Sequence, residues 1–189
     1  YRDGRTTGMM EAAFSKTPKA TIFAQTGIQF MPINTLYQLL SLVESGSPQL
    51  EIAETFLTAP DLLNYWLTGA RVCEFSNATT TQLFNPTTGT WATDLMDQLG
   101  IPSRIFPEIV PPGTKLGSYD GIPVIAPACH DTGSAVAAVP TKTKEFAYLS
   151  SGPWSLVGLE VNQPILTPEA LASGLAGSKP ANPDARGAG

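Results

Sequence analysis

The amino-acid sequence predicts an α/β fold, and three features support this prediction. Apolar residues with helical spacing, such as Leu36, Leu39, Leu40 and Val43, alternate with short apolar segments suited to strands. Glycines and prolines separate these segments along the chain. Of the 189 residues, 42% are apolar and 14% are charged, which is enough apolar material for one core of ordinary size.

Helices are predicted where a capping residue or a proline precedes an apolar stripe and a glycine follows it. In chain order the predicted helices run from Thr6 to Phe14, from Asn34 to Gly46, from Ser47-Pro48 onwards, from Pro60 to Gly69, from Thr93 to Leu99, and from Gly133 to Val139. Leu62, Leu63, Trp66 and Leu67 are expected to face inward from the fourth helix, and the last helix is expected to be buried. Pro140 ends it.

Strands are predicted in the apolar segments between these helices. They comprise Thr55 to Leu57, a segment after residue 75 that turns at Asn85-Pro86, Ile122 to Ala126, and the pair Phe146 to Leu149 and Trp154 to Leu159 around a turn at 150–153. Residues 101–121 are expected to form a loop, because they hold four prolines and three glycines.

Charge and composition exclude several classes of function. The net charge of −5, with no cluster of Lys and Arg beyond Lys142 and Lys144, excludes a nucleic-acid or anionic-membrane surface. The uncharged segment Thr21 to Val43 carries several glutamines and Pro32, and their polar groups would need hydrogen-bond partners in lipid. This argues against a membrane span. One histidine and two cysteines without a C-x-x-C pair argue against zinc and favour reduced thiols in a cytoplasmic protein.

Asp131 is the strongest candidate for a chemical role. The order is a short strand, then Cys129-His130-Asp131, then a helix. A carboxylate at a helix start stays ionised beside the positive end of the helix dipole, and in α/β folds ligands bind at the carboxyl ends of strands. Such a carboxylate can accept a proton from an alcohol. The alternatives are that Asp131 only caps the helix and that His130 is a structural histidine.

Three other groups are weaker candidates, each with a structural alternative. Ser150-Ser151-Gly152 could offer hydroxyls and amides to a phosphate, or could be an ordinary turn. Asp3 and Arg5 could bind a polar ligand, or could form a surface ion pair. Trp66 and Trp154 are expected in the core rather than as platforms for a sugar. Neither the Walker loop nor the G-x-G-x-x-G dinucleotide fingerprint occurs in the sequence. The residues from Gly174 resemble a Walker loop but have the wrong spacing.

Six segments occur in order along the chain: Tyr1-Arg2-Asp3-Gly4-Arg5-Thr6, Thr26 to Phe30 with Asn34 to Leu39, Pro60 to Tyr65 with Leu67-Thr68-Gly69, Ser76 to Leu83, His130-Asp131-Thr132 with Ser134-Ala135-Val136, and Tyr148 to Gly152 with Trp154-Ser155-Leu156. Taken together, these segments resemble the FGGY family of carbohydrate kinases. Within the family, the run from Thr26 to Leu39, Thr79-Thr80-Thr81-Gln82 and His130-Asp131-Thr132 resemble the branch that acts on L-rhamnulose.

The resemblance implies a ribonuclease H-like, actin-like ATPase fold and an organisation in three parts. Residues 1–142 would be the C-terminal part of the family's N-terminal, sugar-binding domain. Residues 143–167 would be the first hairpin of its C-terminal domain. Residues 168–189 would be a disordered tail, because the stretch from Ala172 to Gly189 is rich in Gly, Ala, Pro and Ser without an apolar period and cannot bury enough surface to order it.

The resemblance also implies the chemistry: transfer of the γ-phosphoryl group of ATP to the 1-hydroxyl of L-rhamnulose, with Mg²⁺ offsetting the phosphate charge. It implies that Asp131 takes the hydroxyl proton. His130, Thr132, Asp3 and Arg5 would hold the sugar, and Ser150, Ser151, Gly152 and Pro153 would contact the nucleotide.

Two other functions remain open: a kinase of the same family for xylulose, fuculose or a related ketose, and a non-catalytic protein that keeps the sugar site. A panel of ketose substrates would distinguish the first from a kinase for L-rhamnulose. Calorimetry with sugar and ATP would distinguish the second, which would bind the sugar and show no response to the nucleotide. Because the chain starts at Tyr1, and the family's first phosphate hairpin would precede that residue, we expect a truncated product that is inactive alone.

Pro153 stands where members of the family tend to carry Thr, and proline offers neither a hydroxyl nor an amide N–H to a nucleotide. We expect Pro153→Thr in the full-length gene product to lower the KM for ATP. Steady-state kinetics with varied ATP check this, and an unchanged KM contradicts it.

Overall fold

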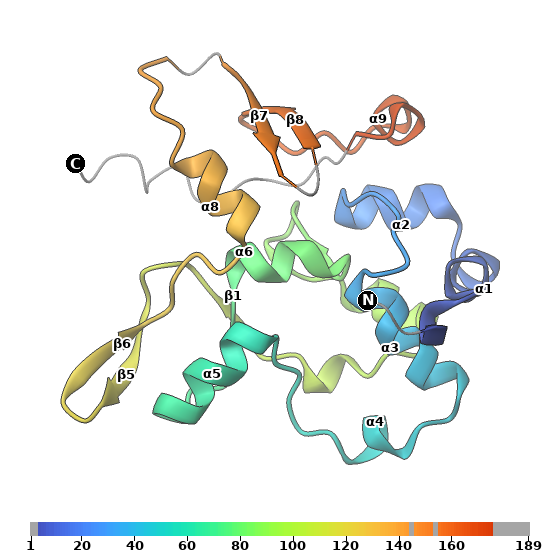
Figure 1. The fold of residues 1–189 in the computed structure, drawn as a ribbon. Coiled ribbons are helices and arrows are strands. Elements are labelled where there is room, and N and C mark those ends of the chain that lie inside the picture. The colour runs from blue at the N-terminus through green and yellow to red at the C-terminus, as the bar shows by residue number, and fades with distance from the viewer. Residues whose placement is uncertain (1–3, 144–145, 153–154, 176–189) are drawn as a thin grey trace.

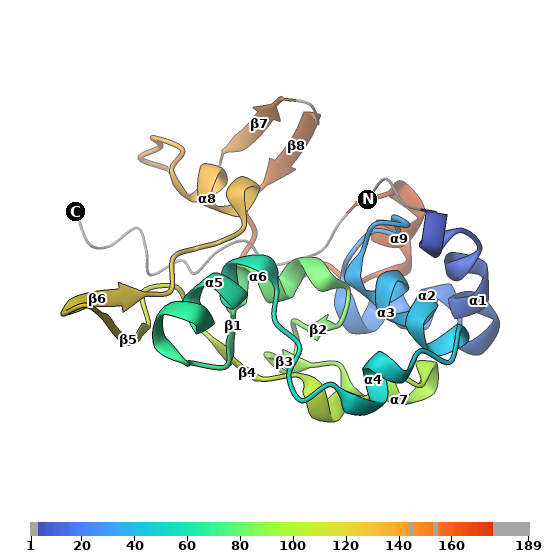
Figure 2. The same ribbon diagram turned by 60° about the horizontal axis from the view of Figure 1, so that its bottom comes forward.

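Helices make up most of the first hundred residues in the computed structural model, which describes residues 4–143, 146–152 and 155–175. Figure 1 and Figure 2 show α1, α2 and α3 gathered at one end of the molecule, with α9 beside α2. The helical elements, with the short 3₁₀ turns written η, are η1 (Gly4–Thr6), α1 (Met9–Lys16), α2 (Lys19–Thr26), α3 (Thr35–Glu44), α4 (Pro48–Ile52), α5 (Ala59–Thr68), α6 (Phe75–Ala78), η2 (Thr79–Thr81), α7 (Thr93–Leu99), η3 (Ser103–Ile105), α8 (Asp131–Ala137) and α9 (Pro168–Ser173).

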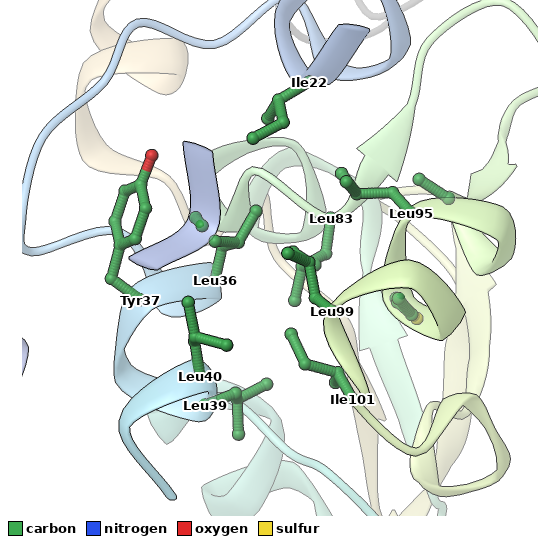
Figure 3. Close-up of a cluster of buried hydrophobic side chains, with 12 residues drawn as sticks. Ile22, Leu36, Tyr37, Leu39, Leu40, Leu83, Leu95, Leu99 and Ile101 are labelled. Carbon is green, nitrogen blue, oxygen red and sulfur yellow. The ribbon is translucent and has the colours of Figure 1, made fainter. Parts of the chain in front are cut away.

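The core lies between α3 and α7. Figure 3 shows Leu36 and Leu40 of α3 facing Leu95 and Leu99 of α7, with Ile22 of α2 above them. All five side chains are fully buried. The apolar stripe predicted for the helix after Asn34 is therefore confirmed as the stripe that builds the core.

The described strands form pairs rather than one broad sheet. Only β1 and β4 run parallel, with Cys73 opposite Ile109, and the other three pairs are antiparallel hairpins. The strands are β1 (Val72–Glu74), β2 (Phe84–Asn85), β3 (Thr90–Trp91), β4 (Glu108–Val110), β5 (Lys115–Tyr119), β6 (Ile122–Ile125), β7 (Ala147–Ser151) and β8 (Ser155–Leu159). Helices and strands alternate along the chain, so the predicted α/β class is confirmed.

Several predicted helix ends are confirmed by their backbone geometry. Gly69 and Gly100 have left-handed φ angles of 75° and 73°, which place them as the residues that end α5 and α7. The Ser47 hydroxyl accepts a hydrogen bond from the Gln49 N–H, with Pro48 in the first turn of α4. The first helix starts at Met9 rather than Thr6, since Gly8 adopts a φ of 77°.

The strand predicted after residue 75 is wrong, because residues 75–81 form α6 and η2. Threonine hydroxyls stabilise these tight turns by donating to carbonyls three residues back, from Thr79 to Ser76, from Thr80 to Asn77 and from Thr81 to Ala78. Local hydrogen bonds therefore override the β-propensity of threonine. The predicted turn at Asn85-Pro86 is confirmed, and it joins β2 to β3.

The strand predicted over Thr55 to Leu57 is also absent. The Phe56 N–H donates to the carbonyl of Ile105, and the Phe56 ring stacks on Phe106 with ring centroids 4.9 Å apart. The segment is fixed by this aromatic packing rather than by a strand ladder. Conversely, residues 101–121, predicted as a loop, hold β4 and β5, because β1 and β6 supply pairing partners.

The inward face predicted for α5 is wrong. Leu63, Trp66 and Leu67 are exposed, and the fully buried residue of the helix is Asp61. Asp61 takes the inner position because its carboxylate accepts hydrogen bonds from the Thr58 hydroxyl and the Glu74 N–H. The helix predicted over Gly133 to Val139 exists, but only Val136 in it is buried.

The tail predicted for residues 168–189 begins with a helix, α9. The Thr167 hydroxyl caps it by accepting from the Ala170 N–H, Pro168 occupies its first turn, and α9 contacts α2. Capping and packing thus order residues whose composition predicted disorder, and residues 176–189 lie outside the described ranges. None of the described helices is long and apolar enough to cross a membrane.

The core and the α5 surface give a matched pair of substitutions. Leu40→Ala removes a fully buried side chain and should lower the free energy of unfolding by about 2–5 kcal/mol. Leu63→Ala, at a side chain that is 57% exposed, should change it by less than about 0.5 kcal/mol. Urea denaturation of the three proteins measures both, and equal losses would contradict this assignment of the core.

Candidate active site

Asp131 is the first residue of α8, immediately after the connection that leaves β6. The start of this connection is fixed by hydrogen bonds from the Gly113 N–H to the Ala126 carbonyl and from the Ala126 N–H to the Thr114 carbonyl. His130 occupies the N-cap position with extended backbone angles, so the cap predicted at Asp131 lies one residue earlier. The predicted order of strand, Cys129-His130-Asp131 and helix is present.

The Asp131 carboxylate is exposed and available as an acceptor. Its Oδ1 accepts from the Thr132 N–H at 2.6 Å and from the Thr132 hydroxyl at 3.2 Å. Among the described residues it joins no ion pair; the pairs there are Lys16–Glu44 and Arg71–Glu54. An ionised carboxylate held in this way has free lone pairs for a ligand hydroxyl.

His130 is half-buried, and this burial favours the neutral form of its imidazole. Burial lowers its pKa, while the charges of Asp131 and Glu74 oppose that shift. The ring lies against Gly133, since a Cβ built there would be 3.2 Å from Nδ1. A glycine at this place leaves room for the imidazole beside the first turn of α8.

Glu74 and Ser76, which lie beneath the loop before Asp131, were not predicted as part of the site. Glu74 Oε2 accepts from the Cys129 N–H at 3.1 Å, and the Ser76 hydroxyl accepts from the His130 N–H at 3.1 Å. Both side chains are buried. No short sequence pattern marks Glu74, because the residues preferred at a helix N-cap are Ser, Thr, Asp and Asn rather than Glu.

The two thiols beside this loop are protonated and poorly reactive. Burial, followed by the charges of Glu74 and Asp61, raises the pKa of Cys129 to about 12. Burial raises the pKa of the fully buried Cys73 as well. Nucleophilic chemistry by a thiolate is therefore disfavoured at this site.

Ser150, Ser151 and Gly152 lie where β7 ends, as predicted for a hairpin. Ser151 pairs with Ser155 in the pair of residues nearest the turn, and both Ser151 and Gly152 are exposed. β7 contacts α8, so the hairpin is attached to the helix that starts with Asp131. Pro153 and Trp154 lie outside the described residues.

The structure does not bring every candidate to one place. Arg5 belongs to η1, which contacts α3, and Figure 1 and Figure 2 show η1 well apart from the start of α8. Asp3 lies outside the described residues. Trp66 is 66% exposed, so its predicted place in the core is wrong.

Asp131 does not line either of two surface hollows found among the described residues. One hollow, of about 400 Å³, lies between α2 and residues 166–171 and is lined by apolar and uncharged groups. The other lies beside Arg71 and Glu54. Asp131 itself is exposed at the start of α8, beside the half-buried His130 and the buried Ser76 of α6.

Residues 1–133 match the domain described as the N-terminal domain of the FGGY family of carbohydrate kinases. A rhamnulokinase of Pectobacterium atrosepticum is 45% identical over 180 residues, covering 93% of this chain and 36% of the relative. A rhamnulokinase of Oceanobacillus iheyensis is 48% identical over 180 residues, covering 90% of this chain and 38% of the relative. The chain thus spans little more than a third of these relatives.

Solved structures of sugar kinases share the fold. A ligand-bound xylulose kinase from Lactobacillus acidophilus superposes with a TM-score of 0.77 at 22% identity, covering 89% of this chain and 36% of that chain. A gluconate kinase from the same organism gives a TM-score of 0.76 at 22% identity, with the same two coverages. These likenesses support the predicted actin-like sugar-kinase fold.

The environment of His130 predicts how stability depends on pH. Because the folded state lowers the pKa below about 6.5, the unfolded state binds more protons near that pH. Stability should therefore fall as pH drops through about 6.5, and His130→Gln should flatten that fall. His130 is the sole histidine of the sequence, so one imidazole NMR signal reports its titration. A midpoint at or above about 6.5 contradicts this assignment.

Proposed function

Because the chain belongs to the FGGY family of carbohydrate kinases, we propose that its gene product transfers the γ-phosphoryl group of ATP to the 1-hydroxyl of L-rhamnulose. The observation that carries the proposal is the Asp131 carboxylate, exposed at the start of α8 and outside any ion pair of the described residues. The names of the rhamnulokinase relatives support the choice of sugar. Since the chain spans about a third of their length, the activity is proposed for the full-length gene product.

In the proposed reaction Asp131 accepts the proton of the sugar hydroxyl. The hydroxyl oxygen forms a bond to the γ-phosphorus, the bond from that phosphorus to the β,γ-bridging oxygen breaks, and ADP leaves with the electron pair. Such transfers depend mainly on positioning and electrostatics. The two bonds from Thr132 to Oδ1 fix the orientation of the carboxylate and leave Oδ2 for the hydroxyl.

His130 and Thr132 are proposed to hold the sugar beside Asp131. A neutral imidazole has one donor and one acceptor nitrogen, so it can bond two hydroxyl groups of a ketose. The Thr132 hydroxyl already donates to Asp131, and its oxygen can still accept. Arg5 and Asp3 remain predictions for the sugar, and η1 lies apart from α8.

ATP is proposed to contact Ser150, Ser151 and Gly152 at the β7–β8 hairpin. The exposed Ser151 hydroxyl and the Gly152 backbone fit a phosphate-binding turn. Mg²⁺ would offset the charge of the transferred phosphate. The described residues gather no group of three or more His, Cys, Asp or Glu that could hold a metal ion.

Two alternatives from the sequence remain proposals of lower rank. The first alternative is a kinase of the same family that acts on a different ketose. Activity assays with a panel of xylulose, fuculose and rhamnulose would identify the substrate. The second alternative is a protein that binds the sugar without transferring a phosphoryl group. Its support is Pro153, which lacks the hydroxyl and the backbone N–H that threonine would offer to a nucleotide. Calorimetry that gives a sugar response and no ATP response would favour it.

The domain boundary at 142 and a cytoplasmic location also stay predictions.

Asp131→Asn in the full-length gene product should lower kcat by about 10²–10⁴-fold, because the amide cannot take the proton. The matched control is Asp94→Asn, an exposed aspartate in the first turn of α7, which like α8 has seven residues. A coupled assay of ADP release with L-rhamnulose measures both. Equal kcat values for the two variants contradict the role of Asp131.

A further inference from the structure

The side chain of Glu74 is a charged group buried without a charged partner among its hydrogen bonds. It is 0% exposed. Oε1 accepts from the Ser76 N–H at 2.8 Å, and Oε2 accepts from the Ser76 hydroxyl at 2.5 Å, the Asn77 N–H at 3.3 Å and the Cys129 N–H at 3.1 Å. All four donors are neutral. A carboxylate taken out of water is costly unless several hydrogen bonds satisfy it, as here.

The bonds of Glu74 reach the two residues directly before Asp131. The Cys129 N–H bonds Glu74 itself, 55 residues earlier in the chain. The His130 N–H bonds the Ser76 hydroxyl, which in turn donates to Glu74. The other side-chain bonds of this loop are local, from Cys129 to the Pro127 carbonyl and from Ser134 to the Ala128 carbonyl. The long-range hydrogen bonds to the backbone of Cys129 and His130 therefore come from Glu74 and from the Ser76 hydroxyl that is bonded to it.

Glu74 is itself held in place from a second side. Its N–H donates to Asp61 Oδ1 at 3.0 Å, and Asp61 Oδ2 accepts from the Thr58 hydroxyl at 2.6 Å. Asn77 donates to the same Thr58 oxygen at 2.7 Å. The carboxylate that holds the loop is thus fixed to the start of α5 and to α6, both of which lie below α8 in Figure 1.

We propose that Glu74 is a positioning residue for the phosphoryl-transfer reaction, which sets the place of Asp131 and His130 through the backbone N–H groups of Cys129 and His130. The inference depends on the proposed function for its catalytic meaning. A shift of about 1 Å in a reacting group can lower the rate about 10²-fold. Buried hydrogen bonds that fix the position of the loop should therefore raise kcat.

The competing explanation is that Glu74 only caps α6. It does occupy the N-cap position and accepts from the Ser76 and Asn77 N–H groups. A cap needs no bond to Cys129, however, and loss of a cap acts on stability rather than on one catalytic parameter. The two explanations therefore differ in kcat and in amide exchange at residues 129–130.

The Ser76 hydroxyl offers a sharp test, because Thr81 is a matched control. Each hydroxyl donates one bond and accepts one: Ser76 to Glu74 and from His130, Thr81 to Ala78 and from Leu83. Both residues are buried. Ser76→Ala and Thr81→Val should cost similar stability, but only the first releases the loop before Asp131.

In the full-length gene product we expect Ser76→Ala to lower kcat about 10-fold and Glu74→Gln about 10²-fold, with the KM for ATP unchanged. Thr81→Val should change kcat less than about 2-fold. Hydrogen exchange followed by mass spectrometry should show faster exchange over residues 127–132 in the first two variants alone. Ser76→Ala keeps the carboxylate, so it decides the matter even where Glu74→Gln does not fold.

The outcomes separate the two proposals. A wild-type gene product that phosphorylates no ketose contradicts the proposed function, whatever the exchange shows. An active wild type in which Ser76→Ala matches Thr81→Val in both kcat and exchange contradicts the positioning role of Glu74 and leaves the kinase assignment standing.

Discussion

A single buried carboxylate joins β1, α6 and the loop before α8, where the proposed catalytic Asp131 lies. Glu74 ends β1, caps α6 and accepts the N–H of Cys129 in the loop before α8. Hydrogen bonds to a charged group contribute about 1.5–3 kcal/mol each, so several of them offset the cost of burying the charge. Removing one partner would leave a buried charge less satisfied, which makes this arrangement specific as well as stable.

The chain therefore has two parts: a buried base layer of packed and hydrogen-bonded residues, and an exposed candidate site above it. The base is the helical core of Figure 3, where α3 meets α7, together with the polar cluster of Asp61, Thr58 and Glu74. The site is the exposed first turn of α8, with Asp131 facing solvent and His130 half-buried against Gly133. Buried packing and hydrogen bonds beneath α8 would help the proposed Asp131 carboxylate to meet a hydroxyl at a fixed place.

The sequence could predict those features that depend on neighbouring residues. Glycines with left-handed backbone mark the ends of α5 and α7, and the stripe of Leu36 and Leu40 marks the core. The turn from His130 into α8 was predictable for the same reason, because caps and helix starts are local signals.

Features that depend on distant residues were missed. The threonine run 79–81 looked like a strand because its hydroxyl bonds to carbonyls three residues back are not visible in a propensity. The inner position of Asp61 on α5 was missed because its hydrogen-bond partner, Glu74, is 13 residues away in the chain. The importance of Glu74 lies in a bond to Cys129, and no pattern over a short window reports such a bond.

The central claim is that Asp131 meets the hydroxyl that becomes phosphorylated. A crystal structure of the full-length gene product with L-rhamnulose and a non-hydrolysable ATP analogue measures this most directly. The account predicts the Asp131 carboxylate about 2.6–3.2 Å from the sugar 1-hydroxyl, with the Cys129 N–H still bonded to Glu74. A sugar bound elsewhere, with Asp131 beyond hydrogen-bond reach of any hydroxyl, would contradict it.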